Sequence, residues 1–354
     1  MGESSRDNPD RVLAVTLDPG ALDLDDQVLA VVRELVPSWS GAGALTIAPV
    51  HGGITNRLFR ASSRGCPQVL VRVYGDNTEV VIDREAENRL FAALSRQGFA
   101  PAYLGRFENG RVEGWLDGFR PLTPGELGQP GLRSLIAKEL RVLHGLPIAV
   151  GEDRLWGTLG TWMERAQTVA FEGEQKGARD ALGLEHYFRI LSRLRSVEQG
   201  LLRSSQGRPG AAEAFRVVLS HNDLLAGNVL TNEDRSRVRF IDYEYGAPAP
   251  AAFDIANHFC EYAGFDSDFA SGFPSRADRD DFIAHYLGSS ATPETVADFS
   301  RIVEFYVLPD HLWWGSWAVV QARYSPIDFD YLEYARLRLA GFDLHSATLG
   351  FDLG

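Results

Sequence analysis

The sequence predicts an α+β protein built as two lobes, a small antiparallel β-sheet lobe followed by a larger, mainly helical lobe. Three observations support this. The 354 residues suffice for two domains at roughly 150 residues each. Short β-prone runs joined by glycine-rich turns dominate the part before Asp117–Gly118, and apolar residues spaced three and four apart dominate the part after it. We therefore expect a first lobe over residues 1–117 and a second over 118–354.

The first lobe opens with a helix and continues with strands. Apolar residues from Leu24 to Leu35 follow a helical period, and Pro37 ends the pattern. Charged and apolar residues alternate with the same period between Asp83 and Gln97, which predicts one amphipathic helix after the third strand. The predicted strands cover residues 45–50, 58–61, 68–74, 103–108 and 111–116.

The sequence of the second lobe predicts a series of helices. The polar stretch from Ser204 to Gly210 predicts a surface loop between two of them. The predicted helices cover residues 132–143, 158–171, 186–202, 279–286, 296–307 and 313–324.

Composition excludes several classes of protein. Hydrophobic residues make up 45% and charged residues 23%, which is typical of a globular protein with a core. The formal net charge of −13 disfavours a nucleic-acid partner and favours a small cationic substrate. No apolar run is long enough to span a membrane and no secretory signal is evident, so we expect a cytoplasmic protein. Cys66 and Cys260 lie too far apart to suggest a zinc site.

The segment His221–Asn228, HNDLLAGN, carries the strongest chemical signal. Asp223 and Asn228 have the five-residue spacing of the kinase catalytic loop, whose Asp accepts the proton of the substrate hydroxyl and whose Asn binds magnesium. Asp242 follows the β-prone run Val238–Ile241, where a second metal-binding Asp is expected. An Asx pair alone could simply shape a turn, but Asp242 at this distance argues for chemistry. Oxygen ligands such as Asn228 and Asp242 suit Mg²⁺, which phosphoryl transfer requires.

The first lobe supplies residues suited to a nucleotide. In the run Gly52–Asn56, the small residue Gly53 allows backbone amides to approach phosphate, and Thr55 and Asn56 add hydrogen-bond donors; an ordinary hairpin turn is the alternative. Arg72 lies on a predicted strand and Glu87 on the following helix. The pair is similar to the strand-cation and helix-Glu ion pair of kinases, with Arg in place of Lys.

From Gly52 to Tyr334 the sequence resembles the choline and ethanolamine kinase family, a branch of the two-lobed protein-kinase-like fold shared with aminoglycoside phosphotransferases. The motifs that carry the resemblance are GGITNRLF, VLVRVYG, DREAENRLF, HNDLLAGN, IDYEY, FDIANHFCEY and WWGSWAVVQARYSPIDFDY. The residues Gly246–Ala252 depart from the family pattern, and the protein-kinase DFG glycine and APE motif are missing.

The resemblance implies a role for each motif residue. It makes Asp223 the catalytic base, with Asn228 and Asp242 as magnesium ligands, and it places Arg72 on phosphate and in a pair with Glu87. Gly53, Thr55 and Asn56 would also contact ATP. Asp254 would anchor the catalytic loop. The amine site would consist of one acid and four aromatic side chains, Glu261, Tyr245, Trp314, Trp317 and Tyr334.

These amine-site residues suit an ammonium group, because a carboxylate supplies countercharge and ring faces attract cations. The helical spacing of Trp314 and Trp317 alone would equally indicate core packing. Leu224–Leu225 and Ala263–Gly264 look more like the ethanolamine branch. The implied activity is phosphorylation of ethanolamine by ATP and Mg²⁺, giving phosphoethanolamine for phosphatidylethanolamine synthesis.

Several alternatives stay open. A choline kinase or a dual-specificity kinase fits the same motifs, and an aminoglycoside kinase would need a wider, acid-lined sugar site. A non-catalytic nucleotide-binding scaffold is a candidate of another class. The resemblance also leaves a homodimer open.

Overall fold

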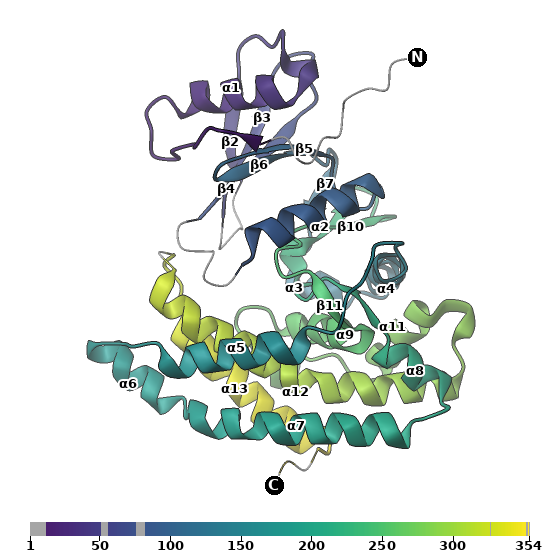
Figure 1. Cartoon of the computed structure of the whole chain (residues 1–354). Coiled ribbons are helices and arrows are strands. Elements are labelled where there is room, and N and C mark those ends of the chain that lie inside the picture. Colours follow the sequence, from purple (N-terminus) through teal and green to yellow (C-terminus); the bar gives the residue numbers. More distant parts are fainter. Residues whose placement is uncertain (1–11, 51–55, 76–81, 326, 352, 354) are drawn as a thin grey trace. The chain divides into compact units, whose positions relative to one another are not determined.

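The protein is described from a computed structural model that defines residues 12–50, 56–75, 82–325, 327–351 and 353. The chain divides into two units: Met1–Phe119 with Ser325–Ile327, and Arg120–Tyr324 with Asp328–Gly354. The first unit contains the large sheet and the second most of the helices (Figure 1). This distribution confirms the predicted α+β class.

A six-stranded sheet forms the centre of the first unit, with strand order β1-β5-β6-β4-β3-β2. The β2–β3, β3–β4, β4–β6 and β5–β6 pairs are antiparallel, as predicted. The edge differs, because the short strand β1 pairs in parallel with β5. The elements of this unit are β1 (Val12–Leu13), α1 (Leu24–Leu35), a 3₁₀ turn (Pro37–Trp39), β2 (Thr46–Val50), β3 (Asn56–Ser62), β4 (Val69–Tyr74), α2 (Arg84–Arg96), β5 (Tyr103–Phe107) and β6 (Gly110–Gly114).

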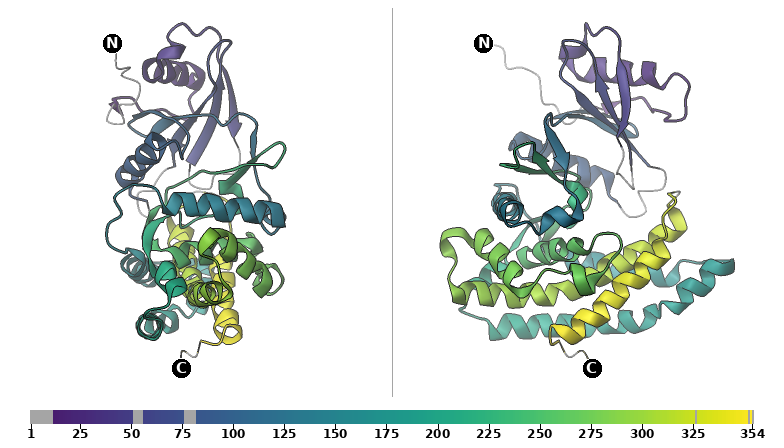
Figure 2. Two further views of the ribbon diagram at one scale, coloured as in Figure 1. Left: turned by 90° about the vertical axis from the view of Figure 1, so that its right-hand side faces the viewer. Right: turned by 180° about the vertical axis from the view of Figure 1, so that it is seen from behind.

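Helix α1 lies across one face of this sheet (Figure 2). Its residues Val28 and Val32 are fully buried in one core cluster with Val71 and Val73 of β4. Because successive side chains of a strand point to opposite faces, the residue between those two valines, Arg72, points away from α1. The alternating sequence of β4 therefore builds an apolar core on one face and delivers a cation to the other.

Gly105 lets α1 approach strand β5 closely. Its φ of 139° lies in a region that L-residues rarely adopt, and a Cβ atom there would lie 2.7 Å from Cδ2 of Leu35. The ladder between β5 and β6 also shifts register between Tyr103 and Gly105. A side chain at this position would be strained and would force the Leu35 side chain to move.

The second unit is mainly helical and contains two small sheets, of strand orders β10-β9-β7 and β11-β8. Short 3₁₀ segments occupy Ala226–Asn228, Glu261–Ala263 and Gly288–Ser290. The other elements are β7 (Phe119–Pro121), α3 (Pro124–Leu127), α4 (Pro130–His144), α5 (Leu155–Thr168), α6 (Gly173–Ala181), α7 (Leu184–Ser204), α8 (Pro209–Phe215), β8 (Val217–Ser220), β9 (Val229–Asn232), β10 (Val238–Phe240), β11 (Ala247–Pro250), α9 (Ala251–Cys260), α10 (Phe269–Gly272), α11 (Arg276–Leu287), α12 (Pro293–Tyr324) and α13 (Tyr331–Thr348).

The 32-residue helix α12 is continuous, so the prediction of separate helices over 296–307 and 313–324 is wrong. Pro309 lies inside it and removes one backbone N–H from the helical ladder. Helix α12 is buried along most of its length and packs against α5, α8, α9 and α13, and this packing holds it together through the proline. It provides one long support for residues of the candidate site.

The predicted loop at 204–210 is also shorter than expected. Helix α7 includes Ser204 and helix α8 begins at Pro209, which is a favourable residue for a first helical turn. Only residues 205–208 lie between the two helices.

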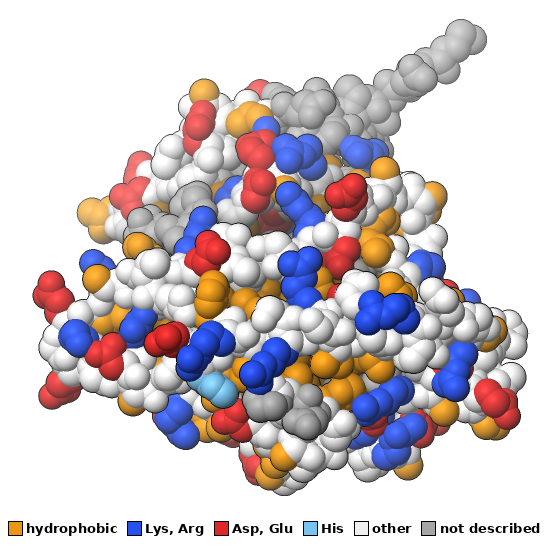
Figure 3. Space-filling view, turned by 60° about the horizontal axis from the view of Figure 1, so that its bottom comes forward, with side chains coloured by type: hydrophobic (Ala, Val, Ile, Leu, Met, Phe, Trp, Pro, Cys, Tyr) orange, Lys and Arg blue, Asp and Glu red, His pale blue; other side chains and the backbone are white. Residues whose placement is uncertain are grey.

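The surface shown in Figure 3 carries both signs of charge. Lys and Arg side chains lie among Asp and Glu side chains, with apolar side chains between them, so no single sign of charge covers this face. Within the described part of the chain, no helix has the length and apolar composition needed to cross a membrane.

Candidate active site

Residues 221–228, the predicted catalytic loop, connect β8 to β9 in the second unit. Asn222 has a φ of 64°, a left-handed conformation that Asn tolerates better than most residues. The side-chain amide of Asn222 donates a 2.9 Å hydrogen bond to the carbonyl of Tyr245. The loop thus turns sharply immediately before Asp223 and is tied to the segment that follows β10.

Asp254, at the start of helix α9, anchors the loop through hydrogen bonds to its backbone. Its two carboxylate oxygens accept hydrogen bonds from the backbone N–H groups of His221 at 2.7 Å and Asn222 at 2.8 Å. His144 Nε2 lies 2.9 Å from the same carboxylate. Burial raises the pKa of Asp254, but these contacts outweigh it and hold the pKa below its usual value. The expected role of Asp254 as an anchor of the loop is confirmed by these contacts.

The carboxyl group of Asp223 is buried and faces Asn228. The side-chain amide of Asn228 donates to the Asp223 carbonyl at 2.8 Å and to its Oδ2 at 2.9 Å. Burial and the negative charges of Glu261 and Asp242 raise the pKa of Asp223 well above its usual value. A positive charge near this carboxyl group would favour its ionised form.

Asn228 and Asp242 offer oxygen atoms suited to Mg²⁺. Because Nδ2 of Asn228 is engaged by Asp223, its Oδ1 is left to accept a ligand. Asp242 follows β10 with a φ of 65°, and Ile241 before it is tied to both ends of the catalytic loop: its N–H donates to the Asn228 carbonyl at 3.0 Å and its carbonyl lies 2.9 Å from His221 Nε2. The side-chain oxygens of Asn228 and Asp242 are therefore ligands of the kind that a hard divalent cation prefers.

An aromatic cluster lies in the same unit and consists of Tyr245, Trp314 and Trp317. The ring centroids of Tyr245 and Trp314 are 5.1 Å apart, and those of Trp314 and Trp317 are 5.2 Å apart, both in edge-to-face geometry. Trp317 Nε1 donates a 2.8 Å hydrogen bond to the Tyr245 hydroxyl. The buried Nε1 of Trp314 has no partner among the described residues. Three of the four sequence-predicted aromatic residues are thus brought together by helix α12 and the segment after β10, whereas the Tyr334 ring packs against Phe265 and Phe329.

Glu261, which directly follows helix α9, is 7% exposed. Its Oε1 accepts a 3.1 Å hydrogen bond from Nη1 of Arg338 on helix α13. Burial raises the pKa of Glu261 to about 7 even though Arg338 acts to lower it. Tyr334, one turn before Arg338, is buried, and its pKa is raised by burial and, less strongly, by the charges of Glu261 and Asp223. The charge of Glu261 thus acts on Asp223, and the charges of both act on Tyr334.

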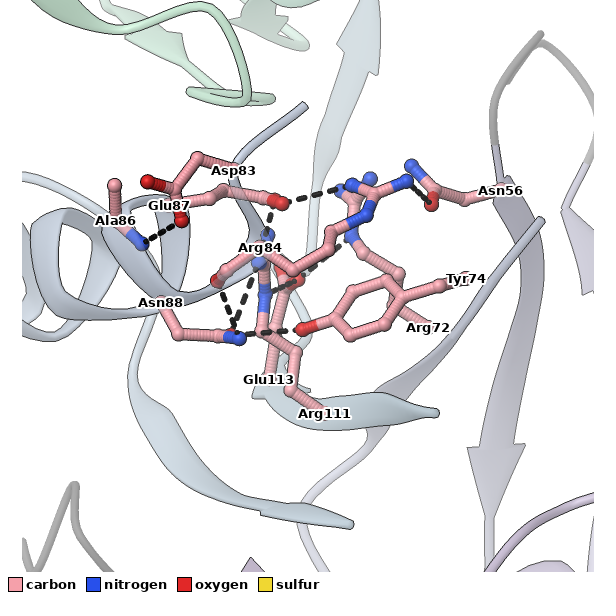
Figure 4. A network of polar contacts seen from close by, with 10 residues as sticks. All are labelled: Asn56, Arg72, Tyr74, Asp83, Arg84, Ala86, Glu87, Asn88, Arg111 and Glu113. Carbon is pink, nitrogen blue, oxygen red and sulfur yellow. Dashed lines mark hydrogen bonds and ion pairs between the residues drawn. The ribbon is translucent and has the colours of Figure 1, made fainter. Parts of the chain in front are cut away.

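The first unit holds a separate network of buried charges beside helix α2 (Figure 4). Arg72 Nε donates to Glu113 Oε1 at 2.9 Å, and Arg111 Nε donates to the same oxygen at 2.7 Å. Arg111 Nη1 continues the network to Glu87 Oε1 at 2.6 Å, and Arg84 Nη1 donates to Glu87 Oε2 at 2.8 Å. Burial raises the pKa of Glu87, but the charges of Arg111 and its neighbours outweigh burial and bring the pKa to about 2.

The predicted association of Arg72 with Glu87 is part of a wider arrangement. Arg72 acts electrostatically on Glu87, which receives direct hydrogen bonds from Arg111 and Arg84. Asn56, at the start of β3, accepts a 3.1 Å hydrogen bond from Arg84 Nη2 and so joins the same network. Gly53 and Thr55 lie outside the described residues.

Four residues that complete these clusters were not predicted from the sequence. Arg111 and Glu113 carry opposite charges two residues apart on β6, and this strand pattern places both on one face. Asp310 and Arg338 gave no comparable signal, because a charged residue within a helical pattern usually lies on a solvated face.

Comparisons with known proteins give a consistent result. Residues 47–343 match the family described as choline/ethanolamine kinase. A probable ethanolamine kinase of Arabidopsis thaliana is 35% identical over 324 residues, which cover 88% of this chain and 83% of that protein. Probable choline kinase 3 of the same plant is 30% identical over 347 residues, covering 92% of this chain and 94% of that protein.

A solved structure of a Plasmodium vivax ethanolamine kinase is 26% identical and superposes with a TM-score of 0.78 over 92% of this chain and 89% of that one. The predicted kinase-like fold is thereby confirmed. Since the family match spans most of the chain and curated relatives above 30% identity cover nearly all of it, the protein belongs to the choline/ethanolamine kinase family.

Proposed function

We propose that the protein is an ethanolamine kinase, which transfers the γ-phosphoryl group of ATP to the hydroxyl of ethanolamine. One observation carries the proposal. The buried carboxyl of Asp223, hydrogen-bonded to Asn228 at 2.9 Å, shares an acidic environment with Glu261 in the unit that also holds the aromatic cluster. A residue suited to act as the base and residues suited to bind a cation thus lie in one unit, and relatives named ethanolamine kinase support the choice of amine.

Asp223 is the proposed catalytic base. It would orient the substrate hydroxyl for in-line attack and accept its proton as the new P–O bond forms. The bond from Asn228 and the anchoring of residues 221 and 222 by Asp254 fix the position of this carboxylate.

Asn228 and Asp242 are the proposed ligands of Mg²⁺, because they offer one amide and one carboxylate oxygen. When bound, the ion would neutralise charge on the phosphate oxygens. Its positive charge would also favour the ionised form of Asp223.

Glu261 and the rings of Tyr245, Trp314, Trp317 and Tyr334 are the proposed amine site. The carboxylate would supply countercharge, and a primary ammonium would in addition donate N–H bonds to its oxygens. These contacts are all made to the amine end of the substrate, which the reaction leaves unchanged. Selectivity among amino alcohols would therefore lie in recognition of the amine end.

The first unit would contribute to nucleotide binding, consistent with a functional division at residues 117 and 118. We assign phosphate contact to Arg72 and, from the motif alone, to Gly53 and Thr55. Asn56 and Glu87 would set the position of these contacts through the buried network that includes Arg84 and Arg111.

Choline kinase is the second candidate. The observation that favours it is the aromatic cluster itself, since three rings within 6.4 Å of one another suit a quaternary ammonium that cannot donate hydrogen bonds. Relatives named choline kinase match the chain over a similar length.

An ADP-release assay with Mg²⁺ and ATP, run on ethanolamine, choline and no amine, tests the proposal. A higher kcat/KM for ethanolamine supports it, and a higher value for choline supports the second candidate. No turnover with either amine, together with thermal stabilisation by Mg²⁺ and ATP, would instead support a nucleotide-binding scaffold. The variant Asp223→Asn should abolish turnover while retaining that stabilisation.

The cellular setting is proposed from the sequence. We assign a cytoplasmic location, which fractionation of cells expressing the protein would check. A homodimer is the proposed assembly, and light scattering in solution would distinguish the mass of two chains from that of one.

A further inference from the structure

A continuous series of hydrogen bonds runs from Glu261 to the catalytic loop. Arg338 donates to Glu261 at 3.1 Å and also to the carboxylate of Asp310. Asn257 Nδ2 donates to Asp310 Oδ1 at 3.0 Å, and Asn257 Oδ1 accepts from the backbone N–H of Leu224 at 2.8 Å. Leu224 directly follows Asp223, so this buried chain ends one residue from the proposed base.

The members of this chain come from elements far apart in sequence. Arg338 lies on α13, Asp310 on α12 and Asn257 on α9, and each is at most 1% exposed. His258 reinforces the end of the chain, since its Nδ1 lies 2.9 Å from the Leu224 carbonyl. Three helices are therefore joined to the catalytic loop by buried polar side chains.

Buried ion pairs are an inefficient way to stabilise a core. Desolvation opposes the attraction between the charges, and well-packed apolar residues of similar volume often give equal or greater stability. The Arg338–Asp310 and Arg338–Glu261 pairs are both buried, with side-chain exposures of 8% or less. Their occurrence beside the proposed amine site points to a role in positioning.

The charges of Glu261, Asp310 and Arg338 do not balance. Glu261 and Asp310 are two acids that face one cation, Arg338. Glu261 Oε1 is engaged by Arg338, and Oε2 has no hydrogen-bond partner among the described residues. An ammonium group at Glu261 would bring a second positive charge to two negative ones.

We propose that Arg338 and Asp310 are positioning residues which, through Asn257, hold the carboxylate of Glu261 in a fixed position relative to the catalytic loop. This inference rests on the proposed function, since it takes Glu261 as the amine-binding acid. Asp310 has a defined part in it: by sharing Arg338, it prevents that cation from being neutralised by Glu261 alone and leaves Glu261 able to bind an ammonium.

Arg338→Lys tests the positioning role. Lysine keeps the charge but lacks the planar fork that reaches both acids. We expect the KM for amine to rise and kcat to fall, together lowering kcat/KM roughly tenfold to hundredfold, with the KM for ATP within about twofold.

Arg279→Lys is the matched control. Arg279 donates to Glu304 at 2.9 Å in a pair whose side chains are also less than a tenth exposed, and neither residue contacts the chain described above. If Arg338→Lys lowers the melting temperature as Arg279→Lys does and leaves the kinetics of amine use unchanged, the positioning role is wrong.

Asp310→Asn combined with Glu261→Gln gives a second test. Alone, Asp310→Asn should raise the KM for amine several-fold, because Arg338 then competes with the ammonium for Glu261. In the Glu261→Gln background it should have little further effect, since both changes act through one carboxylate. Additive effects would overturn the proposal. Failure of the proposed function would look different, because the unaltered protein would then turn over neither amine.

Discussion

The indole N–H of Trp317 donates a 2.8 Å hydrogen bond to the hydroxyl of Tyr245, and this bond fixes the angle between two rings of the aromatic cluster. The centroids of the two rings lie 6.4 Å apart with planes 81° from parallel. The bond links helix α12 to the segment after β10, so the shape of the cluster depends on one hydroxyl group.

Tyr245→Phe removes that hydroxyl and leaves a buried indole N–H without its acceptor. We expect the KM for amine to rise about fivefold, corresponding to about 1 kcal/mol, with little change in the KM for ATP. Tyr306→Phe is the control, because it removes a buried hydroxyl that donates to Glu198 at 2.7 Å. Both variants should unfold at lower denaturant concentration, but only Tyr245→Phe should alter amine kinetics. Equal kinetic effects would contradict the assignment.

Trp317→Leu should raise the KM for amine roughly twofold to thirtyfold, the effect of losing one cation–π contact of about 0.5–2 kcal/mol. Trp317→Phe keeps a ring face and should recover part of that loss. Steady-state kinetics with the amine and ATP varied separately provide the measurement. An equal rise in the KM for ATP would show that the assignment of Trp317 to the amine site is wrong.

The KM for amine should depend on pH through Glu261. Its pKa is raised to about 7, mainly by burial, so the carboxyl is neutral below that pH and ionised above it. A neutral carboxyl attracts an ammonium less, and kcat/KM for amine should therefore fall as pH decreases below about 7. The groups acting on Glu261 are Arg338, which lowers its pKa, and Asp310, which raises it, while Asp223, Tyr334 and Cys260 also interact with it.

Measuring kcat/KM for amine between pH 5.5 and 8.5, with ATP saturating, checks this expectation. In Glu261→Gln the decrease in kcat/KM at low pH should disappear, and kcat/KM should be lower overall. If the same decrease remains in that variant, another group is responsible for it.

Arg111→Met should destabilise the first unit by about 3–5 kcal/mol, because it leaves the buried carboxylates of Glu87 and Glu113 without their shared cation. In the unaltered protein, the folded-state pKa of Glu87, about 2, lies below its ordinary value of 4.5. The stability from Glu87 is thus present above about pH 4.5 and is lost as pH falls toward 2. In Arg111→Met the folded-state pKa of Glu87 should rise toward its ordinary value, so this pH-dependent loss of stability should be smaller.

Urea unfolding at several pH values measures both effects. Arg106→Met is the matched control, because Arg106 pairs with Glu85 at 2.6 Å where Glu85 is 62% exposed. That change should cost less than about 1 kcal/mol. A similar cost for both arginines would mean that the buried network contributes little.

The sequence predicted what is local along the chain. The predicted catalytic loop and Asp254 lie in short motifs, and the valine-rich sequence of β4 predicted the strand that carries Arg72. Helix α13 was missed because its buried side includes Arg338 and His345, so apolar residues do not mark one face. Pro309 caused another error, since proline usually ends a helix and here tertiary packing prevails.

Contacts between distant residues were beyond sequence reasoning. Arg338 lies 77 residues from Glu261 and Arg111 lies 24 residues from Glu87, and neither spacing has a periodicity to recognise. Such pairs exist only once the helices or strands that carry them have packed. The aromatic residues were found because the family resemblance named them, since their helical spacing alone is equally that of a core.

The position of Arg338 also bears on how the chain matures as it is made. Synthesis proceeds from the N-terminus, so Glu261 and Asp310 are translated 77 and 28 residues before the one cation that faces both. Until helix α13 emerges, two acids would have to be buried without a countercharge, which is strongly unfavourable. Residues 221–228 therefore acquire their final support late, and a nascent chain that ends before α13 would contain these residues and Glu261 but not the cation that holds the Glu261 carboxylate.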